Sequence, residues 1–118
     1  MVSEPAKPEF SVAASAYEGH MVVTVRGELD LRTAPEMDTA IGAALTMHPY
    51  TLTLDLSGVT FMDSAACHTL VRARQGAFKA AVELELRGIT DSCRRTLELL
   101  ELDKLFTFTA TDGDGQGT

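Results

Sequence analysis

The sequence has few cysteines, no tryptophan and no long apolar run. Its two cysteines, Cys67 and Cys93, lack the spacing of metal ligands and predict neither a disulfide framework nor a zinc site. No apolar stretch approaches the roughly 18 residues of a membrane-spanning helix, and residues 1–9 lack the hydrophobic region of a signal peptide. We therefore expect a cytoplasmic protein without metal, cofactor or membrane contact.

Positive charge is also scarce, because 10 Lys and Arg stand against 17 Asp and Glu and give a net charge of −7. Binding to nucleic acid or to an anionic membrane needs a basic surface, so we expect neither as a partner. The 118 residues are one domain's worth of chain, 45% of it hydrophobic. Apolar residues are sparse at both ends, which predicts tails at 1–9 and 111–118 around one domain at 10–110.

Alternation of apolar and polar residues predicts several strands. In Thr51–Leu56 every second residue is leucine, and 82–87 repeats the pattern. Strands covered on both faces would be apolar throughout, so clean alternation favours helices mainly on one face of the sheet. We expect strands at 10–16, 21–25, 51–56, 82–87 and 106–109.

Three segments have helical periodicity. The first is expected to begin in a capping box, with the Thr33 side chain bonded to a helix amide, and to end before Pro49. The second and third are expected at 64–80 and 91–100. Their predicted inward side chains are Cys67, Leu70, Val71 and Phe78, then Cys93, Leu97 and Leu100. The order of elements predicts an α/β fold with a mixed sheet of four to five strands.

The junction between the third strand and the second helix carries the candidate functional residues. We expect the strand to end at Leu56 and a connector to follow in which Val59 and Phe61 face the core. Asp63 or Ser64 then caps the helix, and capping is the commonest role for these residue types. A second interpretation is a modifiable switch, because a phosphate at a helix N-terminus adds about −1.5 to −2 charges among unpaired amides.

The same junction resembles a known family. Phe61-Met62-Asp63-Ser64, preceded by Asp55-Leu56-Ser57 and followed by an apolar helix, is similar to the signature of the STAS domain. The similarity is greatest to its bacterial branch of anti-sigma factor antagonists, or anti-anti-sigma factors. Arg26–Asp30 with Thr33-Ala34, and 94–106, resemble two further segments of that family in the same order.

The resemblance implies a STAS fold and regulation of transcription by partner switching. The unphosphorylated antagonist binds an anti-sigma factor, itself a serine kinase, and so frees a sigma factor. Phosphorylation of the serine that matches Ser64 ends this binding, and a phosphatase, expected to be of the PP2C type, resets the cycle. The antagonist is thus a phosphoprotein and a binding partner, and we expect no enzyme.

The chain departs from the family directly after this serine. Where the family commonly reads Asp-Ser-Ser/Thr-Gly-Leu, this chain has Asp63 to Cys67 as Asp-Ser-Ala-Ala-Cys. The alanine in place of glycine can alter partner choice or kinase docking. His68 and Arg72 follow at one-turn intervals and form either a basic docking strip or a solvated helix face. The expected partner-binding residues are Asp30, Asp63, Ser64, Ala65, Ala66, His68 and Arg72.

Three alternatives to this switch stay open. Ser64 can be a cap only, in a constitutive STAS interaction module. The same helix N-terminus can bind a nucleotide or small anion. Asp63, Ser64 and His68 also contain the residue types of a hydrolase. That reading is weak, because one helical turn seldom aligns such groups and no nucleophile elbow is present.

Overall fold

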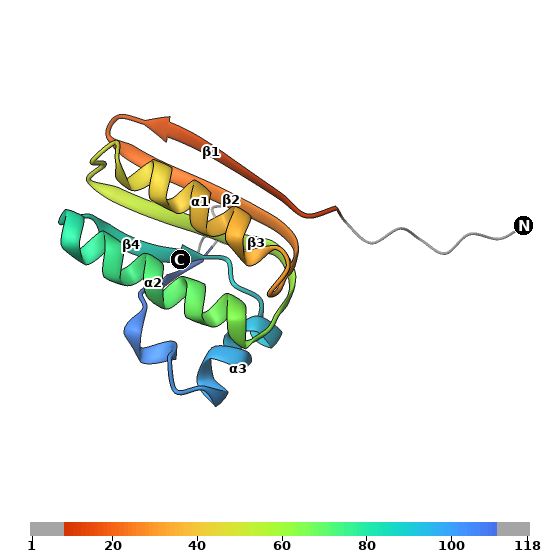
Figure 1. Cartoon of the computed structure of the whole chain (residues 1–118). Helices are drawn as coiled ribbons and strands as arrows, with labels where there is room; N and C mark the ends of the chain where they lie inside the picture. Colours follow the sequence, from red (N-terminus) through yellow and green to blue (C-terminus); the bar gives the residue numbers. More distant parts are fainter. Residues whose placement is uncertain (1–8, 111–118) are drawn as a thin grey trace, which may run out of the picture.

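The computed structural model describes residues 9–110, so the expected tails, apart from Glu9, lie outside the described residues (Figure 1). One five-stranded sheet has the order β1-β2-β3-β4-β5. The predicted α/β fold with a mixed sheet is confirmed. The elements are β1 (Ser11–Tyr17), β2 (His20–Leu29), α1 (Ala34–Leu45), β3 (Thr51–Met62), α2 (Ser64–Ala80), β4 (Glu83–Arg87), α3 (Asp91–Leu99), the 3-10 helix η1 (Asp103–Leu105) and β5 (Phe108–Thr109).

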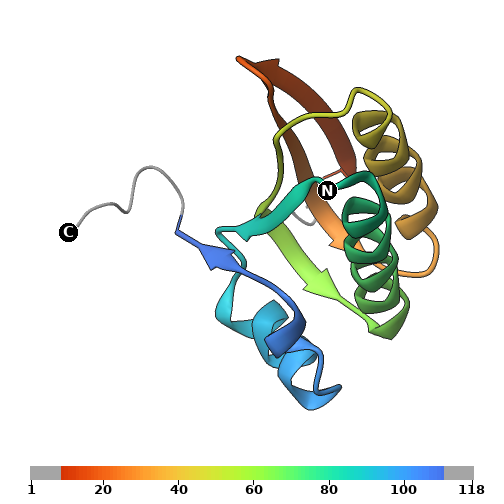
Figure 2. The ribbon, with the colours of Figure 1, turned by 90° about the vertical axis from the view of Figure 1, so that its left-hand side faces the viewer.

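The sheet is mixed because its first pair is a hairpin. β1 runs antiparallel to β2 across a two-residue turn, Glu18 and Gly19, both at the positive φ that such tight hairpins require. β2, β3, β4 and β5 are parallel neighbours. Parallel crossovers are nearly always right-handed, so a sheet that grows in one direction collects its helices on one face. Figure 2 shows α1 and α2 together on one face, as the alternation predicted.

The core lies between this face and the helices. Leu52, Leu54 and Leu56 of β3 are fully buried, as the alternation predicts. Both cysteines are free and buried, which confirms their predicted place in the core. Burial, helped by the nearby Asp63 charge and by Cys93, raises the pKa of the Cys67 thiol to about 11, so this thiol stays protonated at neutral pH.

Strand β3 is longer and less regular than expected. It continues to Met62, and its register against β2 shifts at two points, beyond Thr24 and beyond Gly27. Each shift places an extra residue in β3 and turns the following side chains toward the other face. Val59 therefore faces the core as predicted, but Phe61 is 48% exposed and Met62 is buried instead. The prediction of an inward Phe61 is wrong because the alternation does not continue through the bulges.

Helix α2 has the predicted bounds, and Cys67 and Leu70 of its predicted inward stripe are fully buried, whereas Val71 is half-buried and Phe78 faces outward. Phe78 is 84% exposed, because small side chains (Ala66, Ala73 and Ala77) pack with Leu70 against the sheet. Helix α3 buries Cys93 and Leu97 as expected, whereas Leu100 is the C-cap and is 40% exposed. Of the last predicted strand, only Phe108–Thr109 pairs with β4.

The start of α1 is not a capping box. Thr33 makes no side-chain bond to the helix, because its hydroxyl donates to the carbonyl of Glu28 at 2.8 Å. The side chain therefore closes the loop that precedes the helix rather than the helix itself. Among residues 9–110, no helix is long and apolar enough to cross a lipid bilayer.

Candidate functional site

Ser64 is the first residue of α2, directly after β3 ends at Met62 and Asp63 caps the helix. The Oδ1 atom of Asp63 accepts the N–H of Ala66 at 2.9 Å, and its carbonyl accepts the N–H of Cys67 at 3.2 Å. Ser64 is exposed, and its hydroxyl has no hydrogen-bond partner within residues 9–110. The sequence allowed either residue to be the cap. In the structure Asp63 is the cap, and the Ser64 hydroxyl is left open to solvent.

The second carboxylate oxygen of Asp63 connects this junction to the loop between β2 and α1. Its Oδ2 atom accepts the N–H of Leu31 at 3.1 Å, while the N–H of Asp63 donates to the carbonyl of Leu29 at 3.2 Å. We call the two side-chain bonds, to Ala66 and to Leu31, the Asp63 clasp. One carboxylate thus holds a helix start and a neighbouring loop together beside Ser64.

Asp30 organises that loop. Its Oδ1 atom accepts the N–H groups of Arg32 and Thr33 at 3.0 and 3.1 Å, and its own N–H donates to the Thr33 hydroxyl at 2.9 Å. Removal of water acts to raise the pKa of Asp30, but the bonds from Thr33 and Arg32, together with the Arg32 charge, outweigh it. The pKa of Asp30 is therefore lowered from its ordinary value of 3.8. Asp30 is a charged brace for the loop.

The exposed face of α2 beyond Ser64 carries His68 and Arg72. Arg72 donates to the Thr69 hydroxyl at 2.8 Å and lies 3.9 Å from a carboxylate oxygen of Asp38 on α1. A groove of about 220 Å³ separates the starts of α1 and α2, and Leu31, Ala65, His68 and Arg72 are among its lining residues. Arg72 lies eight residues beyond Ser64, roughly 12 Å along the helix at 1.5 Å per residue, so it is a weak candidate for neutralising a charge on Ser64.

The structure brings most of the predicted set to one end of the sheet, but one residue does not fit. Ala66 is fully buried, so it cannot offer its side chain to a partner; the helix turns this position toward the core. Two exposed apolar residues were missed: Leu31, 75% exposed, whose amide is in the clasp, and Phe61. In the sequence, Leu31 could have been noticed as an apolar residue between the charged residues Asp30 and Arg32. The exposure of Phe61 was not predicted, because the bulges in β3 turn its side chain outward.

The hydrolase alternative has no geometric support. Within the described residues, Ser64 makes no hydrogen bond to His68, although both are exposed on the same helix. A nucleophile that is activated by a base needs that contact within reach.

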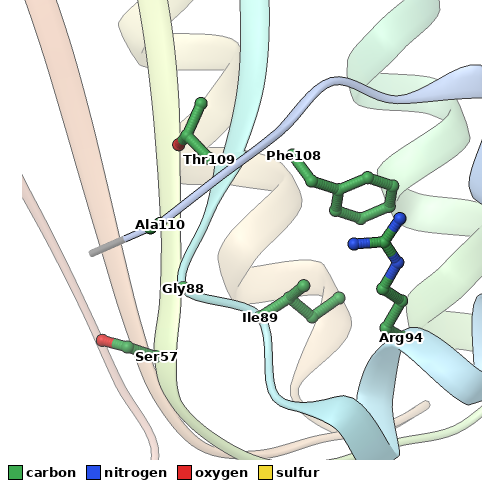
Figure 3. Close-up of a pocket in the computed structure, with 7 residues that line it drawn as sticks. All are labelled: Ser57, Gly88, Ile89, Arg94, Phe108, Thr109 and Ala110. Carbon is green, nitrogen blue, oxygen red and sulfur yellow. The ribbon is translucent and has the colours of Figure 1, made fainter. Parts of the chain in front are cut away.

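A larger cavity, with a volume of about 500 Å³, lies elsewhere (Figure 3). It shares no lining residue with the groove beside Ser64. Arg94, a lining cation, has its guanidinium 4.0 Å from the centre of the Phe108 ring and 3.8 Å from a Glu98 oxygen. This cavity lies apart from the start of α2 and does not bear on the small-anion alternative there.

Comparison with known proteins gives a family and a fold. The family model described as the STAS domain matches residues 11–114. The chain is 30% identical over 106 residues to the anti-sigma-F factor antagonist RsfB of Mycobacterium tuberculosis. The aligned region covers 90% of this chain and 86% of that protein.

Solved structures agree with this family. A crystal structure of an anti-sigma factor antagonist from Mycobacterium paratuberculosis is similar with a TM-score of 0.79 and 31% identity, covering 90% of each chain. The unphosphorylated form of the anti-sigma factor antagonist SpoIIAA has a TM-score of 0.72 at 18% identity, covering 90% of this chain and 91% of that one. At that identity the likeness shows the fold alone.

Proposed function

The chain belongs to the STAS domain family, and from this premise we propose that it is a cytoplasmic anti-sigma factor antagonist switched by phosphorylation of Ser64. In the unphosphorylated state it binds an anti-sigma factor that is a serine kinase. Phosphorylation ends the binding, and a PP2C-type phosphatase restores it. The antagonist relatives from mycobacteria support the general role. The observation that carries the switch is the open hydroxyl of Ser64 beside a cap supplied by Asp63.

The surface around Ser64 has the composition of a protein interface. Leu31 and Phe61 offer exposed apolar area next to the junction, and His68 and Arg72 supply polar rim groups. Protein interfaces commonly combine an apolar centre with a polar rim. The unphosphorylated site therefore favours a protein partner over a small ligand.

A phosphate on Ser64 would place a dianion one residue from the Asp63 carboxylate. The amides of the first helical turn favour negative charge, but Asp63 already bonds the amide of Ala66 and occupies the amide of Cys67 with its carbonyl. Arg72 lies eight residues beyond Ser64, roughly 12 Å along the helix. The new charge would thus be poorly neutralised locally, and a partner that covers it would have to remove its water. A loss of 1.4 kcal/mol already weakens binding tenfold.

The direct test is phosphate transfer measured by intact mass. We would incubate the protein with ATP and each candidate anti-sigma kinase that binds it, and count the phosphates added. One phosphate is expected on the wild type and on Ser92→Ala, and none on Ser64→Ala. Ser92 is the matched control because it is an exposed serine in the first turn of α3.

Two results would contradict the switch. Phosphate transfer to Ser64→Ala at the wild-type rate would place the modification elsewhere. If a kinase binds the wild type tightly but transfers no phosphate to it, the protein acts instead as a constitutive interaction module. A PP2C-type phosphatase that removes the phosphate and restores binding would complete the cycle.

A further inference from the structure

An apolar groove lies along the far half of α2, well away from Ser64. Phe78 is 84% exposed and borders a hollow of about 210 Å³ between α2, β4 and residues 105–107. Its apolar lining includes Val82, Leu84 and Phe106. We call this hollow and the exposed ring the Phe78 groove. Exposed apolar surface beside a hollow is a feature of protein docking sites.

The rim of the Phe78 groove is basic in an acidic chain. Helix α2 contains three Lys and Arg residues and no Asp or Glu, although the whole chain has a net charge of −7. Arg74 and Lys79 border the exposed ring. Arg74 is held in place because its Nε donates to the carbonyl of Leu105 at 2.8 Å. Lys79 has no ion-pair partner within residues 9–110. The groove therefore fits an occupant that is both apolar and acidic.

The end of α3 has that chemistry. Leu99 is 78% exposed and Leu100 is 40% exposed. Glu98 and Glu101 flank them and are exposed as well. The nearest cation to Glu98 is Arg94 at 3.8 Å, a pair in which both side chains are about half exposed, so the contact is weak and replaceable. We call residues 98–101 the acidic knob.

We propose that two copies of this chain associate by docking the acidic knob of one copy into the Phe78 groove of the other. The choice of a second copy rests on charge complementarity, because one chain carries both an apolar groove with a cationic rim and an apolar knob with acidic flanks. Within a single copy the leucines of the knob stay exposed, so they do not fill their own groove.

The Phe78 groove and the start of α2 lie at different ends of the helix. Phe78 is fourteen residues from Ser64 along one helix, which corresponds to roughly 21 Å at 1.5 Å per residue. The groove half of the contact is therefore distant from Ser64. The proposal does not depend on the proposed function of Ser64.

A charge swap tests the contact directly. One variant carries Arg74→Glu with Lys79→Glu, and the other carries Glu98→Lys with Glu101→Lys. Each variant alone pairs like charges and should associate at least tenfold more weakly than the wild type. An equimolar mixture pairs opposite charges in both contacts and should associate about as well as the wild type. Sedimentation velocity over a range of concentrations measures the mass, which for a monomer is 12.7 kDa.

Two controls separate the contact from general effects. Arg26→Glu with Arg32→Glu changes the net charge as much as the first variant, but on other elements, and should leave association unchanged. Phe78→Ser should weaken association at least tenfold while the circular dichroism spectrum and thermal unfolding stay near those of the wild type, since the ring is exposed. A wild-type protein that sediments as a monomer up to millimolar concentration overturns the proposal. So does a mixture that stays monomeric while both variants are folded.

Discussion

The starts of α2 and α3 are built alike and differ in one contact. In each helix the capping side chain accepts a first-turn amide: Asp63 takes that of Ala66 at 2.9 Å, and Thr90 takes that of Cys93 at 3.2 Å. Each first turn also carries an exposed serine, Ser64 or Ser92. A carboxylate has two oxygens, however, and the second oxygen of the α2 cap reaches Leu31 across 32 positions of sequence.

That contact changes what surrounds the serine. At α2 the clasp holds an apolar loop residue, Leu31, next to the junction, and Phe61 is exposed just before it. At α3 the residue before Ser92 is the exposed acid Asp91. A capped helix with a serine is a common structural unit. The connection to a second loop is what distinguishes the start of α2 as a candidate protein interface.

The largest expected effect is on partner binding. Ser64→Asp should weaken binding to the anti-sigma factor more than tenfold, since a partner would have to cover a second carboxylate beside Asp63. Ser92→Asp adds the same charge at the other helix start and should change the affinity less than twofold. Isothermal titration calorimetry measures both. Equal losses for the two variants would show that total charge, rather than the place of the charge, controls binding.

Replacing Ala66 by glycine restores the residue that the family commonly has there. Ala66 is fully buried in a helix, so Ala66→Gly should lower the free energy of unfolding by about 1–2 kcal/mol through the lost methyl and the added backbone freedom. Urea unfolding measures this. The phosphorylation rate of Ser64 should stay unchanged, because the methyl does not reach the surface. A much faster rate would show that this position controls kinase access.

Removing one oxygen from the clasp should make the α2 start resemble that of α3. Asp63→Ser keeps a capping hydroxyl but loses the bond to Leu31, and should lower the free energy of unfolding by about 1 kcal/mol. Hydrogen exchange of the Leu31 amide should accelerate at least tenfold. The control is Thr90→Ser, which keeps a hydroxyl cap and should change exchange little at either helix. Unchanged exchange at Leu31 would mean that the loop holds its shape without the clasp.

The smallest effect is a dependence of stability on pH. The pKa of Asp30 is lowered in the folded chain, so its charged form stabilises the fold above the ordinary value of 3.8, and this contribution is lost as the pH falls through the folded pKa. The difference in free energy of unfolding between the wild type and Asp30→Asn should therefore be present at neutral pH and shrink in acid below 3.8. The corresponding loop before α3, residues 88–90, has no titratable side chain, so it should contribute no such dependence on pH. A pH-independent difference would show that the Asp30 brace works without its charge.

Features that depend on neighbours in sequence were predicted well. The bounds of α2 follow from an Asp cap and a helical period, and the burial of Leu52, Leu54 and Leu56 follows from strict alternation in a strand. The tight turn at Glu18 and Gly19 lies between the strands predicted at 10–16 and 21–25. Such features need only local rules.

Features that depend on distant contacts were predicted poorly. The alternation gave no sign of the bulges that turn Phe61 outward, since they arise from pairing with β2. Helical period alone placed Phe78 inside, but α2 packs through alanines and the ring stays outside. The sequence at Thr33 matches a capping box, but the Thr33 hydroxyl donates to the carbonyl of Glu28 and does not cap the helix. The candidate serine could be identified from the sequence, whereas the second bond of Asp63, to Leu31, could not.

The simple strand order bears on how the chain acquires its shape during synthesis. Each strand pairs with the strand before it along the chain, so no strand waits for a later one to be inserted between itself and its neighbour. The N-terminal part of a chain leaves the ribosome first. Leu31 and Asp63 both precede β4 and β5. The serine and the loop beside it therefore come entirely from the part of the chain that is translated before the last two strands.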